Sequence, residues 1–123
     1  MSGEAASSTS LDGGAALPGA RGLEGFAWDD GRLLRARVVE CALGRVCGGC
    51  GRPLGRPIAF VGDAEERERN AFHLPPLHVA CAATLQRQPA APAELVTTAG
   101  FEFVRPTRDD ADPEPRFVPN SLL

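Results

Sequence analysis

The sequence lacks several features that would place the chain in a common class of protein. It contains no lysine, so all 13 basic residues are arginine, a bias typical of a GC-rich genome. Its net charge of −3 favours neither a nucleic-acid-binding protein nor a membrane-surface protein. No apolar run is long enough to cross a bilayer, so no membrane partner is expected.

The N-terminal segment also lacks the pattern of a secretory signal. It carries Glu4 and Asp12, and it has neither a basic segment nor a continuous apolar run. We therefore expect a cytoplasmic protein. Because cysteines in a reducing compartment seldom form lasting disulfides, the four cysteines are better interpreted as metal ligands.

The chain is long enough for one domain with a modest core. Glycine and proline contribute 14 and 11 of its 123 residues, which limits the surface that can be buried. We divide it into a flexible N-terminal arm at 1–24, a zinc-stabilised α+β domain at 25–106, and an acidic C-terminal tail at 107–123 whose end is apolar. A structural metal would help so small a core.

Hydrophobic periodicity predicts two helices in the central domain. The first is LLRARVVECALG, which Asp29 or Asp30 can cap and Gly44 can end in the left-handed conformation, although strand alternation also fits its first half. The second runs from Leu77 to about Gln88, between two prolines.

Short apolar runs predict the strands. They comprise IAFVG at 58–62, a segment that begins at Phe72, and ELVTT and GFEFV as a hairpin around Gly100. The charged segment 63–71 is expected to be exposed.

Four residues form a metal-ligand pattern. Cys47 and Cys50 make C-x2-C in a glycine-rich turn, and after a 27-residue spacer His78 and Cys81 make H-x2-C. A tight turn can aim two sulfurs at one point, and residues three apart in a first helical turn share a face. The long spacer adds only about 0.4 kcal/mol of closure entropy, whereas structural zinc contributes on the order of 10 kcal/mol.

Other interpretations of these residues remain open. The cysteines could be small buried apolar residues with His78 on the surface, or C-x2-C could be a redox motif, although Gly51 and Pro53 are poor material for the helix that such a motif requires. Cys41 is expected to be a packed thiol. His73 is expected to be a neighbour of the site and not a ligand.

The segments VCGGCGRPL and LHVACA resemble the treble-clef zinc module, and especially the first half of a LIM domain. The resemblance covers about residues 45–87 and implies a zinc knuckle whose ligands are Cys47, Cys50, His78 and Cys81. The second zinc set of a LIM domain is missing, so LIM partners are not implied. More loosely, the stretch is similar to small zinc-knuckle proteins of actinobacteria and their phages, which implies a bacterial or phage origin and, for a phage protein, a place in the virion.

Three functions are compatible with this pattern. The leading hypothesis is a protein-interaction module held together by one structural zinc, and not an enzyme. The second is nucleic-acid binding, because residues 32–56 contain six arginines against the single acid Glu40. Those arginines are Arg32, Arg35, Arg37, Arg45, Arg52 and Arg56. The third is an HNH-like nuclease using Asn70, His73 and His78, although no carboxylate pair or Ser-His-Asp set accompanies them.

Overall fold

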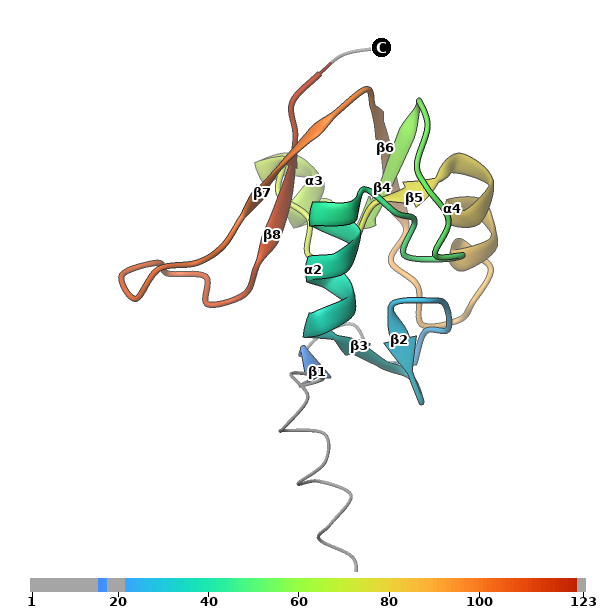
Figure 1. Cartoon of the computed structure of the whole chain (residues 1–123), viewed down its shortest axis with the longest axis horizontal. Helices are drawn as coiled ribbons and strands as arrows, with labels where there is room; N and C mark the ends of the chain where they lie inside the picture. The colour runs from blue at the N-terminus through green and yellow to red at the C-terminus, as the bar shows by residue number, and fades with distance from the viewer. Residues whose placement is uncertain (1–15, 18–21, 122–123) are drawn as a thin grey trace, which may run out of the picture.

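The structure, a computed structural model, describes residues 16–17 and 22–121 and has the expected small α+β fold. Within this part of the chain, three helices alternate with short antiparallel strand pairs (Figure 1). The elements in chain order are β1 (Ala16–Leu17), β2 (Trp28–Asp29), β3 (Arg32–Leu34), α2 (Arg35–Gly44), β4 (Ile58–Gly62), α3 (Ala64–Arg69), β5 (Leu77–His78), α4 (Val79–Gln86), β6 (Glu94–Thr98), β7 (Phe101–Val104) and β8 (Arg116–Pro119).

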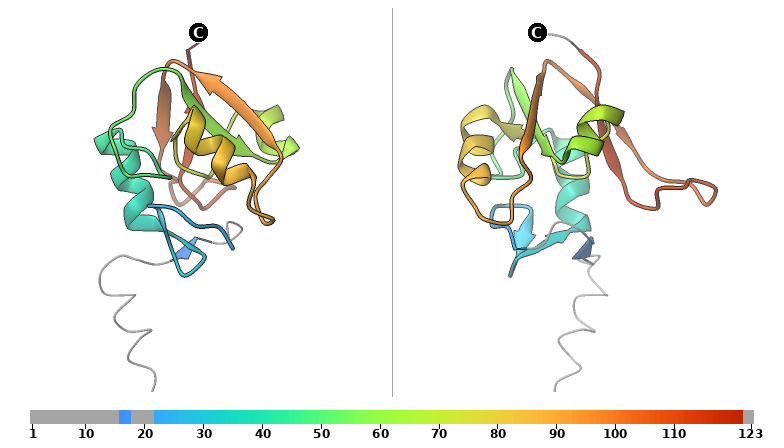
Figure 2. Two further views of the ribbon diagram at one scale, coloured as in Figure 1. Left: turned by 90° about the vertical axis from the view of Figure 1, so that its right-hand side faces the viewer. Right: turned by 180° about the vertical axis from the view of Figure 1, so that it is seen from behind.

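Strand β4 lies at the centre of the fold. It pairs with β5 on one side and β6 on the other, and all five of its residues are buried. Ile58 at its start lies opposite His78 of β5 and Thr98 of β6. Figure 2 shows α4 packed beside this sheet, with α3 close to the far end of β4. The uninterrupted apolar sequence of β4 therefore reflects burial of both faces of this strand.

The first helix begins later than the sequence suggested. Trp28–Asp29 and Arg32–Leu34 form a hairpin, so the aspartates do not cap α2, whose N-cap is Leu34. Asp30 and Gly31 have φ values of 54° and 77°, as a two-residue hairpin turn of type I′ requires. The helix ends at Gly44, but the left-handed residue is Arg45, with φ 53°.

The charged segment 63–71 contains a helix that the sequence analysis missed. Asp63 accepts a hydrogen bond from the Glu66 backbone N–H at 2.8 Å, and the Glu66 side chain accepts one from the Asp63 N–H at 3.1 Å. This reciprocal arrangement is a capping box, which satisfies two donors at the start of α3. Glu66 is buried with 8% of its surface exposed.

The expected strand from Phe72 is wrong. Phe72 makes only an isolated bridge with Phe117, in which each N–H donates to the other residue's carbonyl at 2.8 and 2.7 Å. Pro75 and Pro76 follow and have no N–H to donate, so no ladder can continue.

The expected hairpin of ELVTT and GFEFV is also wrong. Strand β6 pairs with β4, whereas β7 pairs with β8. The Thr98 hydroxyl lies 2.7 Å from the Gly100 carbonyl and 2.6 Å from that of Ser121, which fixes a turn that directs β7 out of the sheet. Figure 1 shows the loop between β7 and β8 extending away from the rest of the chain.

Part of the expected C-terminal tail belongs to the core. Phe117 of β8 is fully buried, and its ring centroid lies 5.7 Å from that of Phe60, 5.5 Å from Phe101 and 4.9 Å from Phe103. Such ring contacts contribute beyond the apolar area they bury. Residues 116–119 therefore complete an aromatic cluster around the second half of β4.

Most of the expected N-terminal arm, residues 1–15 and 18–21, lies outside the described residues. Ala16–Leu17 pairs with β3, and Leu23 is buried with 1% of its surface exposed. None of the described helices has the length and apolar character needed to cross a bilayer.

Candidate metal centre

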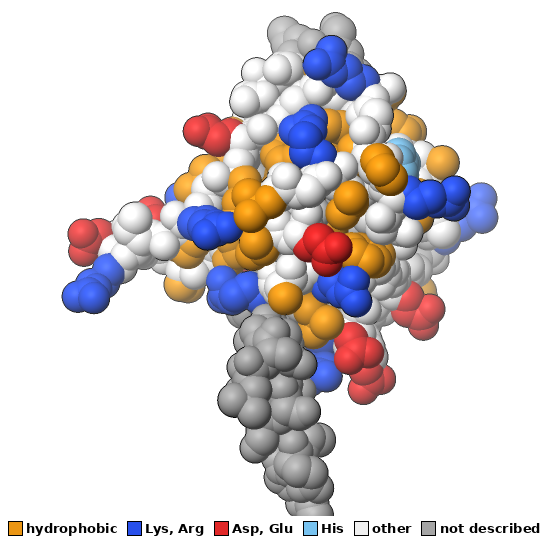
Figure 3. All heavy atoms as spheres, in the orientation of Figure 1, with side chains coloured by type: hydrophobic (Ala, Val, Ile, Leu, Met, Phe, Trp, Pro, Cys, Tyr) orange, Lys and Arg blue, Asp and Glu red, His pale blue; other side chains and the backbone are white. Residues whose placement is uncertain are grey.

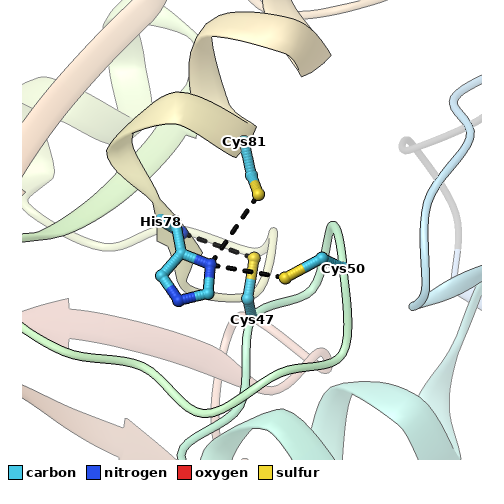
Figure 4. Close-up of side chains that lie close together, drawn as sticks. All are labelled: Cys47, Cys50, His78 and Cys81. Carbon is cyan, nitrogen blue, oxygen red and sulfur yellow. Dashed lines mark hydrogen bonds between the residues drawn. The ribbon is translucent and has the colours of Figure 1, made fainter.

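The structure brings the four predicted ligands together. Cys47 and Cys50 lie in the turn between α2 and β4, His78 ends β5, and Cys81 lies in the first turn of α4 (Figure 4). One ligand atom from each residue lies within 4.8 Å of the others. Segments that are distant in the sequence therefore form one group of three sulfurs and one nitrogen that can hold a metal ion.

Two nitrogen–sulfur distances in the group fit a tetrahedral ion. With Zn–S of about 2.3 Å and Zn–N of about 2.05 Å, sulfur and nitrogen ligands should lie about 3.6 Å apart. The Nδ1 atom of His78 lies 3.4 Å from the Cys50 sulfur and 3.7 Å from the Cys81 sulfur. Three sulfurs and an imidazole are also a donor set that zinc commonly takes.

The surroundings of His78 leave its ring nitrogen Nδ1 available to bind a metal. Its Nε2 lies 2.9 Å from the Pro53 carbonyl oxygen, which can only accept a hydrogen bond. The Nε2–H group therefore donates to Pro53, and Nδ1 keeps a lone pair directed at the sulfurs. A carbonyl partner of this kind orients metal-binding histidines and raises their basicity.

Backbone N–H groups surround the buried Cys47 sulfur. The N–H of Gly49 donates to it at 3.2 Å and the N–H of His78 donates at 3.3 Å. Donors in these positions stabilise negative charge on sulfur. A Cβ at Gly49 would lie 3.1 Å from the Cβ of Cys81, so this position requires a very small residue.

The turn that carries the two cysteines is braced by its own backbone. Gly51 donates to the Cys47 carbonyl at 2.8 Å, Cys47 donates to that of Arg52 at 2.8 Å, and Val46 bridges Pro53. Gly48 donates to the Pro76 carbonyl at 2.8 Å, which ties the turn to the segment entering β5. The sequence folds this way because Gly51 takes φ 76°, a conformation that glycine adopts without strain.

The thiols influence one another's ionisation. Burial alone would raise the pKa of Cys50, but hydrogen bonds from the Arg52 backbone and from Cys47, Cys81 and His78 lower it to about 7. Burial and the neighbouring Cys47 and Cys50 raise the pKa of Cys81 to about 12. A divalent cation among these sulfurs would favour their thiolate forms.

One detail of the predicted site differs. His78 is not in a helical turn, because α4 begins at Val79 and His78 is its N-cap, with an extended backbone at ψ 150°. The pairing of β5 with β4 holds His78, while the helix holds Cys81. The H-x2-C spacing therefore spans the end of a strand and the first turn of a helix.

The remaining candidates lie outside this group. Cys41 is fully buried in α2, where burial, with smaller effects of Cys47 and Glu40, raises its pKa to about 12. His73 is held between two carboxylates, with Nδ1 2.5 Å from Glu66 and Nε2 2.7 Å from Asp112. This cluster was missed, because Asp112 lies 39 residues away in the sequence.

The three residues of the nuclease hypothesis, Asn70, His73 and His78, each contact a different group in the structure. The Asn70 amide donates to the Pro119 carbonyl at 2.8 Å, both nitrogens of His73 contact carboxylates, and His78 belongs to the metal-ligand group.

The six arginines of the nucleic-acid hypothesis lie on different elements. Arg32 lies in β3 and its guanidinium is 4.0 Å from the Asp29 carboxylate, whereas Arg35 and Arg37 lie in α2 and Arg45 is the C-cap of that helix. Arg52 and Arg56 lie in the exposed loop that leads to β4.

Comparison with known proteins finds no family model, curated protein or solved structure that matches this chain.

Proposed function

We propose that this chain is a protein-interaction module stabilised by one structural zinc ion, and that it is not an enzyme. We further propose that it serves as an accessory or assembly component of a bacterial or phage system. The observation that supports this most directly is the convergence of Cys47, Cys50, His78 and Cys81, with the His78 imidazole held in the tautomer that exposes Nδ1 to the sulfurs.

Four protein ligands support a structural and not a catalytic ion. They would fill a tetrahedral coordination shell, so no position would remain for a reactive water or a substrate. The ion would connect the turn after α2 to β5 and α4, which lie on the other side of a 27-residue spacer. This supports a role in holding a binding surface in place.

The histidines support the same proposal. His78 would be a ligand, and both nitrogens of His73 face carboxylate oxygens, which only accept hydrogen bonds when ionised. His73 is thus held as an imidazolium and has no free nitrogen with which to accept a proton as a base. Two exposed apolar side chains, Leu43 and Val79, are suited to contact a partner.

The metal is tested by measuring zinc content and thermal unfolding before and after chelation. We expect one zinc ion per chain and loss of cooperative unfolding in EDTA, because structural zinc contributes on the order of 10 kcal/mol to folding. Cys81→Ser should lower the zinc content. Cys41→Ser should leave it at one ion per chain, which makes it the matched cysteine control. A metal-free protein that melts at the same temperature with and without chelator would contradict the proposal.

A further inference from the structure

Two exposed arginines lie over phenylalanine rings that are two residues apart in one strand and so point to the same side of it. The Arg45 guanidinium carbon lies 4.9 Å from the centroid of Phe101, and that of Arg105 lies 5.7 Å from the centroid of Phe103. Arg45 follows α2, and both rings belong to β7. Together with Leu43 in the last turn of α2, these four residues define what we call the Arg–Phe face.

Both guanidinium groups remain available for a ligand. Within residues 22–121, neither Arg45 nor Arg105 forms an ion pair, whereas Arg116 pairs with two aspartates. Stacking on a ring restricts a guanidinium while its in-plane N–H groups stay free to donate. The two groups are therefore oriented to bind planar anions such as carboxylates, often through two hydrogen bonds each.

An exposed apolar side chain also lies two residues before Arg45 in the sequence. Leu43 is 66% exposed, the larger of the two values for exposed large apolar residues in the described part of the chain. Figure 3, in the orientation of Figure 1, shows arginine side chains among apolar patches, with an acidic side chain near the centre of the view. Arginine and aromatic residues are enriched at protein interfaces.

We infer that the Arg–Phe face binds an acidic segment of a partner protein in which carboxylates flank a bulky apolar side chain. The carboxylates would bind Arg45 and Arg105, and the apolar side chain would contact Leu43. This inference rests on the proposed function and specifies the chemistry of the partner.

The composition of the face favours a protein segment over a nucleic acid. Leu43 would gain nothing from a phosphate backbone, whereas an apolar side chain of a peptide could pack against it. The net charge of the chain is −3, which opposes the long-range attraction that nucleic-acid binders use.

The acidic segment of the chain itself is already engaged elsewhere. Asp110 lies 3.6 Å from Arg116, and Asp112 contacts both His73 and Arg116. These aspartates therefore cannot also occupy the Arg–Phe face without breaking those contacts.

The metal centre would hold one side of this face in place. Arg45 precedes Cys47 by two residues, and its carbonyl accepts a hydrogen bond from the Leu54 N–H at 2.9 Å. The backbone that carries Arg45 is therefore continuous with the turn that presents Cys47 and Cys50. This gives the proposed zinc a role in binding as well as in stability.

The test measures binding of three fluorescent probes to the zinc-loaded full chain. They are a short peptide with Asp and Glu on both sides of two leucines, the same peptide with Asn and Gln, and an oligo-dT strand. We expect saturable, salt-sensitive binding of the acidic peptide alone. The double variant R45E/R105E should weaken it at least about tenfold, and L43S by several fold.

The matched control is R69E/R87E, which changes the net charge equally on exposed residues of other elements. It should retain peptide binding to within about twofold. Zinc content and melting temperature show whether the charge reversal disturbs folding. If it does, the milder variant R45Q/R105Q tests the Arg–Phe face instead.

Several results would overturn the inference. They are tighter binding of oligo-dT than of the acidic peptide, equal losses in the control variant, no saturation by the acidic peptide, or a concentration-dependent self-association that R45E/R105E abolishes. A zinc-loaded, folded protein that binds no peptide contradicts the inference alone. A chain that folds without zinc contradicts the proposed function instead.

Discussion

Replacing His73 by glutamine should destabilise the protein by an amount that depends on pH. Both ring nitrogens lie within hydrogen-bonding distance of a carboxylate oxygen, and the side chain is 23% exposed. The hydrogen bond to Glu66 has the largest effect on the pKa of His73. Burial lowers this pKa, and the hydrogen bond to Asp112 raises it further. Together these effects raise the pKa from 6.5 to about 9. Arg35, Arg116 and Glu114 are the other charged groups that act on this cluster.

The sign of the pH dependence follows from this raised pKa. The folded state binds the proton more tightly than the unfolded state, so the stabilisation is complete below pH 6.5 and disappears as the pH rises through about 9. A shift of this size corresponds to at most on the order of 3 kcal/mol, and partial exposure of the carboxylates reduces it. Between these pH values the difference in the free energy of unfolding between wild type and His73→Gln should shrink by up to about 1.4 kcal/mol per pH unit.

The assay is urea-induced unfolding of wild type and His73→Gln at saturating zinc from pH 6 to pH 10. Using the difference between the two proteins cancels the contribution of the cysteines, whose ionisation changes over the same range. Arg69→Gln is the matched control, because it removes one positive charge from an exposed position in α3. A difference between wild type and His73→Gln that stays constant over this range, or grows with pH, would refute the assignment of His73 as an imidazolium.

Two further predictions concern packing. Gly48→Ala should lower stability by about 1–3 kcal/mol, because the added Cβ would lie 2.4 Å from the Pro75 side chain. Gly55→Ala is its control and should change stability by less than about 0.5 kcal/mol, since nothing lies within 4 Å of the added atom. Thermal unfolding of both variants checks this pair, and equal effects would contradict it. Phe117→Ala should cost about 3–5 kcal/mol in urea unfolding, because the ring is fully buried among three others. A near-neutral result would show that residues 116–119 are a dispensable tail.

The metal-ligand group could be predicted from the sequence because its signal is local. Each ligand pair is separated by two residues, and a tight turn or a first helical turn restricts where both side chains can point. The position of His78 was less predictable. Its extended backbone depends on pairing with Ile58, twenty positions earlier, and the two prolines before it fit either a helix start or a strand end.

The strand pairings were not predictable in the same way. ELVTT and GFEFV are separated only by Ala99, with Gly100 next to it, and would pair if local turn chemistry decided. The fully buried β4 provides a better partner for β6, and the aromatic side chains of β7 are covered by β8 from the end of the chain. Two local features of the sequence could have predicted further elements. Asp30–Gly31 indicates the β2–β3 hairpin, and Asp63 with Glu66 indicates the capping box of α3.

Strand β4 connects the two parts of the molecule that stabilise it. Its first residue, Ile58, lies opposite the candidate ligand His78, whereas Phe60 contacts the aromatic cluster and Gly62 adjoins the α3 capping box. The Arg–Phe face reaches both parts, because Arg45 leads into the metal-binding turn while Phe101 and Phe103 belong to the aromatic cluster. The two arginines would therefore keep a fixed separation only when both ends of β4 are anchored. Because the metal-free chain is not expected to fold, binding of the acidic peptide and the dispersed phenylalanine NMR signals of the aromatic cluster should disappear together during a chelator titration.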